Sequence, residues 1–73
     1  MRSKPNHRRI VGDAIRNYRK QAGLTQEKLA EKSDLHHNFI GELERGNMET
    51  SLTSLLKISK ALKVRVRDLV AEI

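Results

Sequence analysis

Two histidines, an asparagine, two glutamates and an arginine occur together in the segment LHHNFIGELERG, which spans residues 35–46. Histidine and glutamate are common metal ligands and proton carriers. Asparagine, histidine and arginine also form hydrogen bonds with the base edges and phosphates of nucleic acids. These residue types therefore raise two alternatives: a metal or catalytic cluster, or the exposed face of a helix that reads a nucleic acid.

The spacing of these side chains argues against a metal site and against catalysis. His36 and His37 are neighbours, and adjacent side chains on a helix do not face each other. A zinc site takes about three or four protein ligands, whereas the chain has no cysteine and no His-x-x-x-His pair. No spacing of serine, histidine and acid suggests a triad, and so short a chain has little room for a substrate pocket. We expect no metal, no cofactor, no small-molecule effector and no enzymatic activity.

The composition is that of one small, strongly basic domain. The chain has 73 residues and a formal net charge of +6, and before residue 21 seven basic residues stand against the single acid Asp13. A basic surface favours polyanions such as nucleic acid, and plain solubility is the alternative explanation of the same charge. Apolar runs are too short to span a membrane, the N-terminus has no secretory signal and cysteine is absent, so we expect a cytoplasmic protein.

Hydrophobic periodicity and capping residues predict an all-α chain that folds as a compact five-helix bundle. Residues 1–7 are polar and hold the only proline, so we expect a flexible basic N-terminal arm ahead of one domain over 8–73. Gly23 and Gly46 mark helix ends, while Thr25 and Ser51 are N-caps. The expected helices are 10–22, 26–33, 37–45, 52–62 and 66–71.

The third expected helix sorts the opening segment into two faces. Phe39, Ile40 and Leu43 form an apolar side, and the other side gathers the polar residues and one glycine: His37, Asn38, Gly41, Glu42 and Arg45. A short helix, a tight turn and a second short helix with a polar outer face is the helix-turn-helix plan. In that plan the second helix enters the major groove, where asparagine pairs with adenine and glutamate accepts from cytosine.

Three motifs give the chain a family resemblance: RKxxGLTQExLA (19–30), IxxLERG (40–46) and SLxxLLKIxKALKV (51–64). In this order and spacing the chain resembles the Cro/repressor-type, or XRE-type, helix-turn-helix domain over roughly residues 9–70. The resemblance implies a lambda-repressor-like fold and a sequence-specific transcriptional regulator that occupies a double-stranded DNA operator. It extends to small stand-alone members, including restriction–modification controller proteins and antitoxins.

The resemblance also implies roles for individual residues. Base reading falls to the outer face of the third helix: His37, Asn38, Gly41 and Glu42. Phosphate contacts fall to the start of the second helix and to both ends of the third: Gln26, His36, Arg45 and Asn47. Arg19 and Glu44 match a pair that bridges the first and third helices. To these the basic charge of the N-terminal region adds phosphate or minor-groove contacts from Arg8 and Arg9.

The chain departs from the family pattern in and after the turn. Asp34 replaces the usual glycine, Ser33 replaces an apolar residue, and His36 replaces a better capping residue. Gly41, inside a helix, should cost about 0.5–1 kcal/mol relative to alanine. These differences leave the fold intact but leave the bases open, because histidine has no single preferred base. For Glu42 the alternatives to base reading are a repulsive filter against DNA and an intrahelical partner of Arg45.

An apolar surplus in the C-terminal third predicts a symmetric homodimer, because exposed apolar patches usually mark interfaces. The expected interface is Leu56, Val66, Val70 and Ile73. A two-fold dimer reads two half-sites, which a two-fold symmetric operator supplies. Two alternatives stay open: these residues only complete the core, with dimers forming on DNA alone, or the chain is a protein-interaction module, of antitoxin or adaptor type, that keeps the fold.

Overall fold

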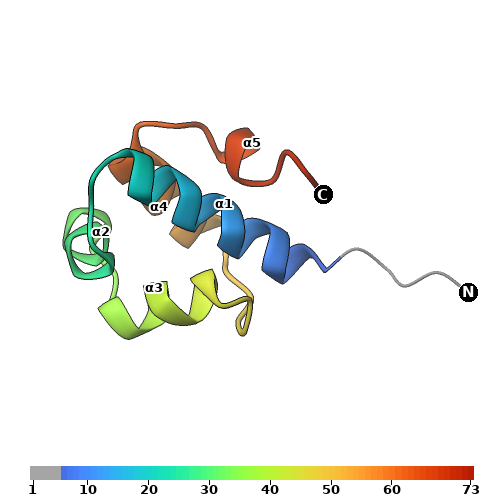
Figure 1. Ribbon diagram of the computed structural model, residues 1–73, viewed down its shortest axis with the longest axis horizontal. Coiled ribbons are helices and arrows are strands. Elements are labelled where there is room, and N and C mark those ends of the chain that lie inside the picture. Colours follow the sequence, from blue (N-terminus) through green and yellow to red (C-terminus); the bar gives the residue numbers. More distant parts are fainter. Residues whose placement is uncertain (1–5) are drawn as a thin grey trace, which may run out of the picture.

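The computed structural model describes residues 6–73, and this part of the chain consists of helices joined by short connections (Figure 1). The helices are α1 (His7–Gln21), α2 (Gln26–Ser33), α3 (His37–Glu44), α4 (Leu52–Leu62) and α5 (Val66–Leu69). The predicted all-α, five-helix architecture is confirmed. Residues 1–5 of the expected arm lie outside the described residues, and the domain boundary stays a prediction. Within 6–73 no helix has the length and apolar character needed to cross a membrane.

The first and last helices differ from the expected bounds. α1 begins at His7 rather than Ile10, because the side chain of Asn6 accepts a hydrogen bond from the backbone N–H of Arg9 at 3.1 Å and caps the helix. Residues 7–9 are polar, so the hydrophobic period could not include them. α5 ends at Leu69, because Val70 leaves the helical region with φ −115° and ψ 12°.

Side chains and backbone conformation at the helix ends explain where the other helices stop and start. Thr25 and Ser51 each accept a hydrogen bond from the backbone N–H three residues on, at 3.0 and 3.1 Å. Asp34 ends α2 in the left-handed conformation, with φ 58° and ψ 46°. Asparagine and aspartate tolerate this region better than most residues. The turn therefore keeps the geometry that a glycine would give it.

The core forms where α1 meets the other helices. In Figure 1, α1 crosses the middle of the molecule, with α3 on one side and α5 on the other, and it contacts both. α2 packs on α3 and α4, so the apolar faces of all five helices meet in one cluster. The buried apolar residues are Val11, Ile15, Leu29, Ala30, Ile40, Leu43, Ile58, Leu62 and Leu69.

Gly12 sets how closely α1 approaches α3. A Cβ at this position would overlap the carbonyl oxygen of Leu43 and lie 3.1 Å from that of Glu44. The backbone of α1 therefore rests directly on the last turn of α3. Only glycine fits this approach, and no sequence period could have indicated it, because the contact joins residues far apart in the chain.

We predict that Gly12→Ala lowers the free energy of unfolding by about 1–3 kcal/mol, because the added methyl group forces α1 away from α3. Urea denaturation followed by circular dichroism measures this change. Gly41→Ala is the matched control: a Cβ there comes no nearer than 3.4 Å to another group, so relief of a helix-interior glycine should raise stability by about 0.5–1 kcal/mol. Equal effects of the two substitutions would contradict the close approach.

Candidate nucleic-acid interface

The turn between α2 and α3 leaves one side of α3 exposed and buries the other. Ile40 and Leu43 are buried in the core, whereas His37 and Asn38 are exposed in the first turn of the helix. The structure therefore places the polar residues of the opening segment on one outer face. The exposed residues of this face and its ends are His36, His37, Asn38, Arg45 and Asn47, with Glu42 half-buried and Gly41 buried beneath them.

A buried ion pair supports this face from behind. Arg19 of α1 donates from Nε to Glu44 Oε2 at 2.6 Å and from Nη2 to Glu44 Oε1 at 3.0 Å. The two side chains are only 11% and 3% exposed. Arg19 also donates from Nη1 to the carbonyl oxygen of Leu24 at 2.8 Å. The expected bridge between the first and third helices is thus formed, as a two-pronged contact that also holds the α1–α2 turn.

Gln26 is hydrogen-bonded to the carboxylate of Glu44. Its Nε2 donates to Glu44 Oε1 at 3.0 Å, which fixes the amide at the first residue of α2. The second amide hydrogen remains available, and the N-terminus of a helix attracts anions through its free N–H groups and dipole. This arrangement suits a phosphate oxygen. The Gln26–Glu44 contact could not be predicted from the sequence, because the two residues belong to different helices and no local pattern joins them.

His36 caps α3 despite being a poor capping residue. Its Nδ1 accepts from the backbone N–H of Asn38 at 3.1 Å. A neutral ring that accepts at Nδ1 carries its hydrogen on Nε2. The cap therefore leaves an N–H donor on the far side of the ring, which is the group a phosphate contact needs.

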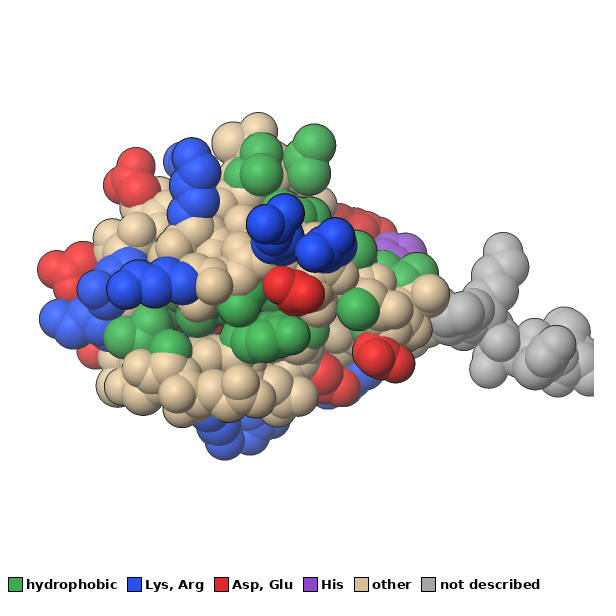
Figure 2. Space-filling model, turned by 90° about the horizontal axis from the view of Figure 1, so that it is seen from above, with side chains coloured by type: hydrophobic (Ala, Val, Ile, Leu, Met, Phe, Trp, Pro, Cys, Tyr) green, Lys and Arg blue, Asp and Glu red, His purple; other side chains and the backbone are tan. Residues whose placement is uncertain are grey.

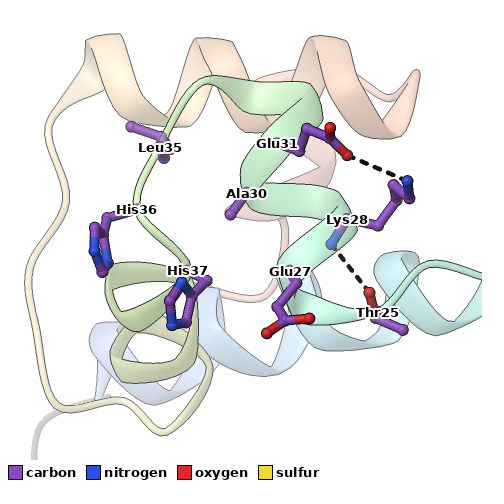
Figure 3. A pocket seen from close by; sticks show the side chains of 8 residues that line it. All are labelled: Thr25, Glu27, Lys28, Ala30, Glu31, Leu35, His36 and His37. Carbon is purple, nitrogen blue, oxygen red and sulfur yellow. Dashed lines mark hydrogen bonds and ion pairs between the residues drawn. The ribbon is translucent and has the colours of Figure 1, made fainter.

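The rings of His36 and His37 stack, with centroids 4.7 Å apart and an angle of 22° between planes. The expectation that they would not face each other was wrong, because His36 has an extended backbone and lies outside the helix. An open hollow of about 530 Å³ lies between α2 and α3, and Figure 3 shows both rings on its α3 side and Glu27 and Lys28 on α2. Within residues 6–73, no group of three or more metal-ligating side chains is placed to hold an ion.

Glu42 forms a second ion pair, on the exposed side of α3. Arg45 Nη2 donates to Glu42 Oε2 at 2.6 Å, and Asn47 Nδ2 donates to Glu42 Oε1 at 3.1 Å. These hydrogen bonds, that of Arg45 first, lower the pKa of the Glu42 carboxyl from its usual value. The intrahelical partner considered for Glu42 is therefore present, and it joins a candidate base reader to two candidate phosphate contacts.

Arg8 and Arg9 lie on the first turn of α1 rather than in an arm. Arg8 Nε donates to Glu49 Oε2 at 3.1 Å, and His7 Nε2 is 2.8 Å from the same oxygen. The hydrogen bonds from His7 and then Arg8 lower the pKa of the Glu49 carboxyl. The backbone of Arg9 lies against Gly46, where a Cβ would be 3.2 Å from Arg9 Cα. The start of α1 therefore adjoins the end of α3.

The chain is similar to known proteins over most of its length. Residues 15–69 match the helix-turn-helix family HTH_3. The chain is 43% identical over 65 residues to control protein C.BamHI from Bacillus amyloliquefaciens, covering 88% of this chain and 80% of that protein. Control protein C.SmaI from Serratia marcescens is 40% identical over 60 residues, covering 82% and 71%. The crystal structure of the restriction–modification controller protein C.AhdI from Aeromonas hydrophila matches with a TM-score of 0.83 and 37% identity, covering 85% and 94%.

A double-mutant cycle tests the energetic role of the buried pair. Arg19→Met and Glu44→Leu should each lower the free energy of unfolding by about 3–5 kcal/mol, because each leaves an unpaired buried charge. The double variant should lose less than the sum, with a coupling energy of about 0.5–3 kcal/mol. Urea denaturation in sucrose, which stabilises folded proteins, keeps weak variants measurable. A coupling energy near zero would show that the two side chains do not stabilise one another.

Proposed function

Because the chain belongs to the helix-turn-helix family HTH_3 and is a sequence-specific DNA-binding transcriptional regulator, we propose that it acts as a homodimer that occupies a double-stranded DNA operator. The observation that carries this proposal is the outer face of α3, where exposed polar side chains stand on a helix whose back is fixed in the core. Such a face presents hydrogen-bonding groups to base edges without a cost in ordering the helix. Regulation follows from where the operator lies, with no catalytic step.

The contacts divide into those that position the protein and those that read sequence. Asn38 and His37, exposed in the first turn of α3, are proposed to meet base edges, where an asparagine amide pairs bidentately with adenine. Gln26 and His36 are proposed to hold a phosphate, because each has a fixed orientation and a free N–H donor. Arg45, Asn47, Arg8 and Arg9 extend the phosphate contacts beyond the two ends of the reading helix.

We further propose that the chain is a controller protein of the restriction–modification type. Its similarity to C.BamHI and C.SmaI extends over most of each protein, which favours this role over a phage-type repressor or an antitoxin. Such a regulator acts where the DNA is, in the cytoplasm of a prokaryotic cell. The rival role, a protein-interaction module, predicts no DNA binding that weakens steeply with salt, so binding to genomic DNA at two salt concentrations separates them.

The proposed dimer uses the apolar surface of α4 and the C-terminal residues. Leu52, Leu56 and Ile73 are 64%, 44% and 59% exposed, while Val66 and Val70 are half-buried. Figure 2 looks onto the side that carries α5 and shows hydrophobic side chains at the surface among lysines and arginines. Ile58 and Leu62, on the same helix, are buried in the core and are not part of this surface. The exposed apolar side chains support an interface between two copies of the chain. A dimer that reads two half-sites would place its two α3 helices about 34–36 Å apart, or a multiple of that.

Asn38→Ala is predicted to weaken binding to a selected operator by about 1–3 kcal/mol and to leave binding to scrambled duplex unchanged, because it removes a base contact. Gln26→Ala is predicted to weaken both to a similar extent, because it removes a phosphate contact. Fluorescence anisotropy on an operator enriched from random duplexes measures both. If the two substitutions change thermal stability alone, the roles given to these residues are wrong.

Leu56→Lys is predicted to convert a dimer into a monomer in sedimentation at micromolar concentration, because a charge on each copy would be buried against the other. Thr53→Lys is the matched control, since it adds the same charge to an exposed position of α4 and removes no large apolar side chain. Circular dichroism confirms that both variants fold. A wild-type chain that sediments as a monomer without DNA would reject the preformed dimer.

A further inference from the structure

Three side chains that meet on the outer face of α3 have opposite preferences for DNA. Glu42 carries a negative charge, which a phosphate repels, and Arg45 and Asn47 are donors that phosphates attract. Both oxygens of the Glu42 carboxylate are occupied, at 2.6 Å by Arg45 and at 3.1 Å by Asn47. In the free protein, Arg45 and Asn47, both proposed to contact the DNA backbone, are therefore already bonded to Glu42 through one nitrogen each.

The cluster of Glu42, Arg45 and Asn47 lies over the middle of the outer face of α3 rather than at the end of that helix. The Arg45 side chain returns over the preceding turn, as long helical side chains do. A Cβ built at Gly41 would be 3.5 and 3.6 Å from the two terminal nitrogens of Arg45, and 3.4 Å from Gln26 Oε1. Gly41 thus leaves the space that the Arg45 guanidinium and the Gln26 amide both approach, so DNA placed against Gln26 lies near the Glu42–Arg45 pair.

Both groups of the pair can exchange partners, because they are not locked in the core. Arg45 and Glu42 side chains are 58% and 38% exposed. Glu44, the other acid of α3, is buried with Arg19, so Glu42 alone of the α3 acids faces outward. A glutamate is ionised at neutral pH, and the hydrogen bond from Arg45 lowers the pKa of the Glu42 carboxyl further. Each of its hydrogen bonds is replaceable by a donor on DNA, and cytosine and adenine present amino groups in the major groove.

We infer, on the proposed function above, that Glu42 sets the discrimination between operator and other DNA by holding Arg45 and Asn47 away from the phosphates. On an operator, cytosine or adenine amino groups donate to Glu42 in place of Arg45 and Asn47, and these released donors turn to the backbone. On other DNA no donor replaces them, so the carboxylate keeps Arg45 and Asn47, and neither side chain is free to bind a phosphate. Glu42 therefore acts chiefly by weakening binding to the wrong sequences.

The test measures non-specific and specific binding separately. Glu42→Gln should tighten binding to a scrambled duplex on the order of three- to tenfold and steepen its salt dependence by about one unit of slope, because Arg45 becomes free to neutralise one more phosphate. Binding to an operator selected from random duplexes should change less, since the glutamine oxygen still accepts from a base. The ratio of the two affinities should fall accordingly.

Two further variants separate this mechanism from a simple gain of charge. Glu31→Gln makes the same change of net charge and opens another exposed i,i+3 ion pair, that with Lys28 on α2, and should leave the ratio of affinities unchanged. In an Arg45→Ala background, Glu42→Gln should no longer tighten non-specific binding. A gain equal to that of Glu31→Gln, or one that survives without Arg45, would overturn the inference. A wild-type chain that binds neither duplex would instead reject the proposed function.

Discussion

The buried contact between Arg19 and Glu44 is the interaction on which the arrangement of α1, α2 and α3 depends. The Glu44 carboxylate of α3 accepts hydrogen bonds from Arg19 of α1 and from Gln26 of α2. It therefore joins all three helices. Inside a protein such a network is strong when every member is paired and costly when one is missing. Within residues 6–73 no buried side-chain nitrogen or oxygen lacks a partner. The orientation of α3 and the position of Gln26, the side chain proposed to bind phosphate, therefore depend on the same carboxylate.

The two glutamates of α3 show how burial decides what an ion pair can do. Glu44 and Glu42 lie two residues apart and so project from different sides of the helix. Glu44 is closed off from water and fixes structure, since its partners cannot leave without stranding a charge. Glu42 is open to water, and its bonds to Arg45 and Asn47 can be exchanged for others at little cost. The same residue type thus supplies a rigid support on one face and an adaptable contact on the other.

Local sequence signals made most of the helix bounds predictable. Contacts between residues far apart in the chain could not be predicted from them. The bounds of α2 and α4 follow from apolar periodicity and from the caps at Thr25 and Ser51, which act within a few residues. The start of α1 at His7 was not predicted, because the first turn of this helix is polar and lies outside the hydrophobic period. The pairing of Arg19 with Glu44 came from family resemblance, as nothing in the chain's own pattern links them. The contacts of Gln26 and Gly12 with α3 depend on how helices pack, and a single sequence carries no record of that.

The backbone contact at Gly12 has a mechanical consequence. Where two backbones touch, no side chain can change rotamer to absorb a displacement. A second close contact, between Arg9 and Gly46, braces the same two helices nearby. α1 and α3 are therefore expected to move together, so that a displacement of the start of α1 is passed to α3. α5 packs on α1 and α4, so a displacement of the chain after Leu69 reaches α3 through packed side chains of other helices, which can adjust their rotamers, and the two ends of the domain are not equivalent points of attachment.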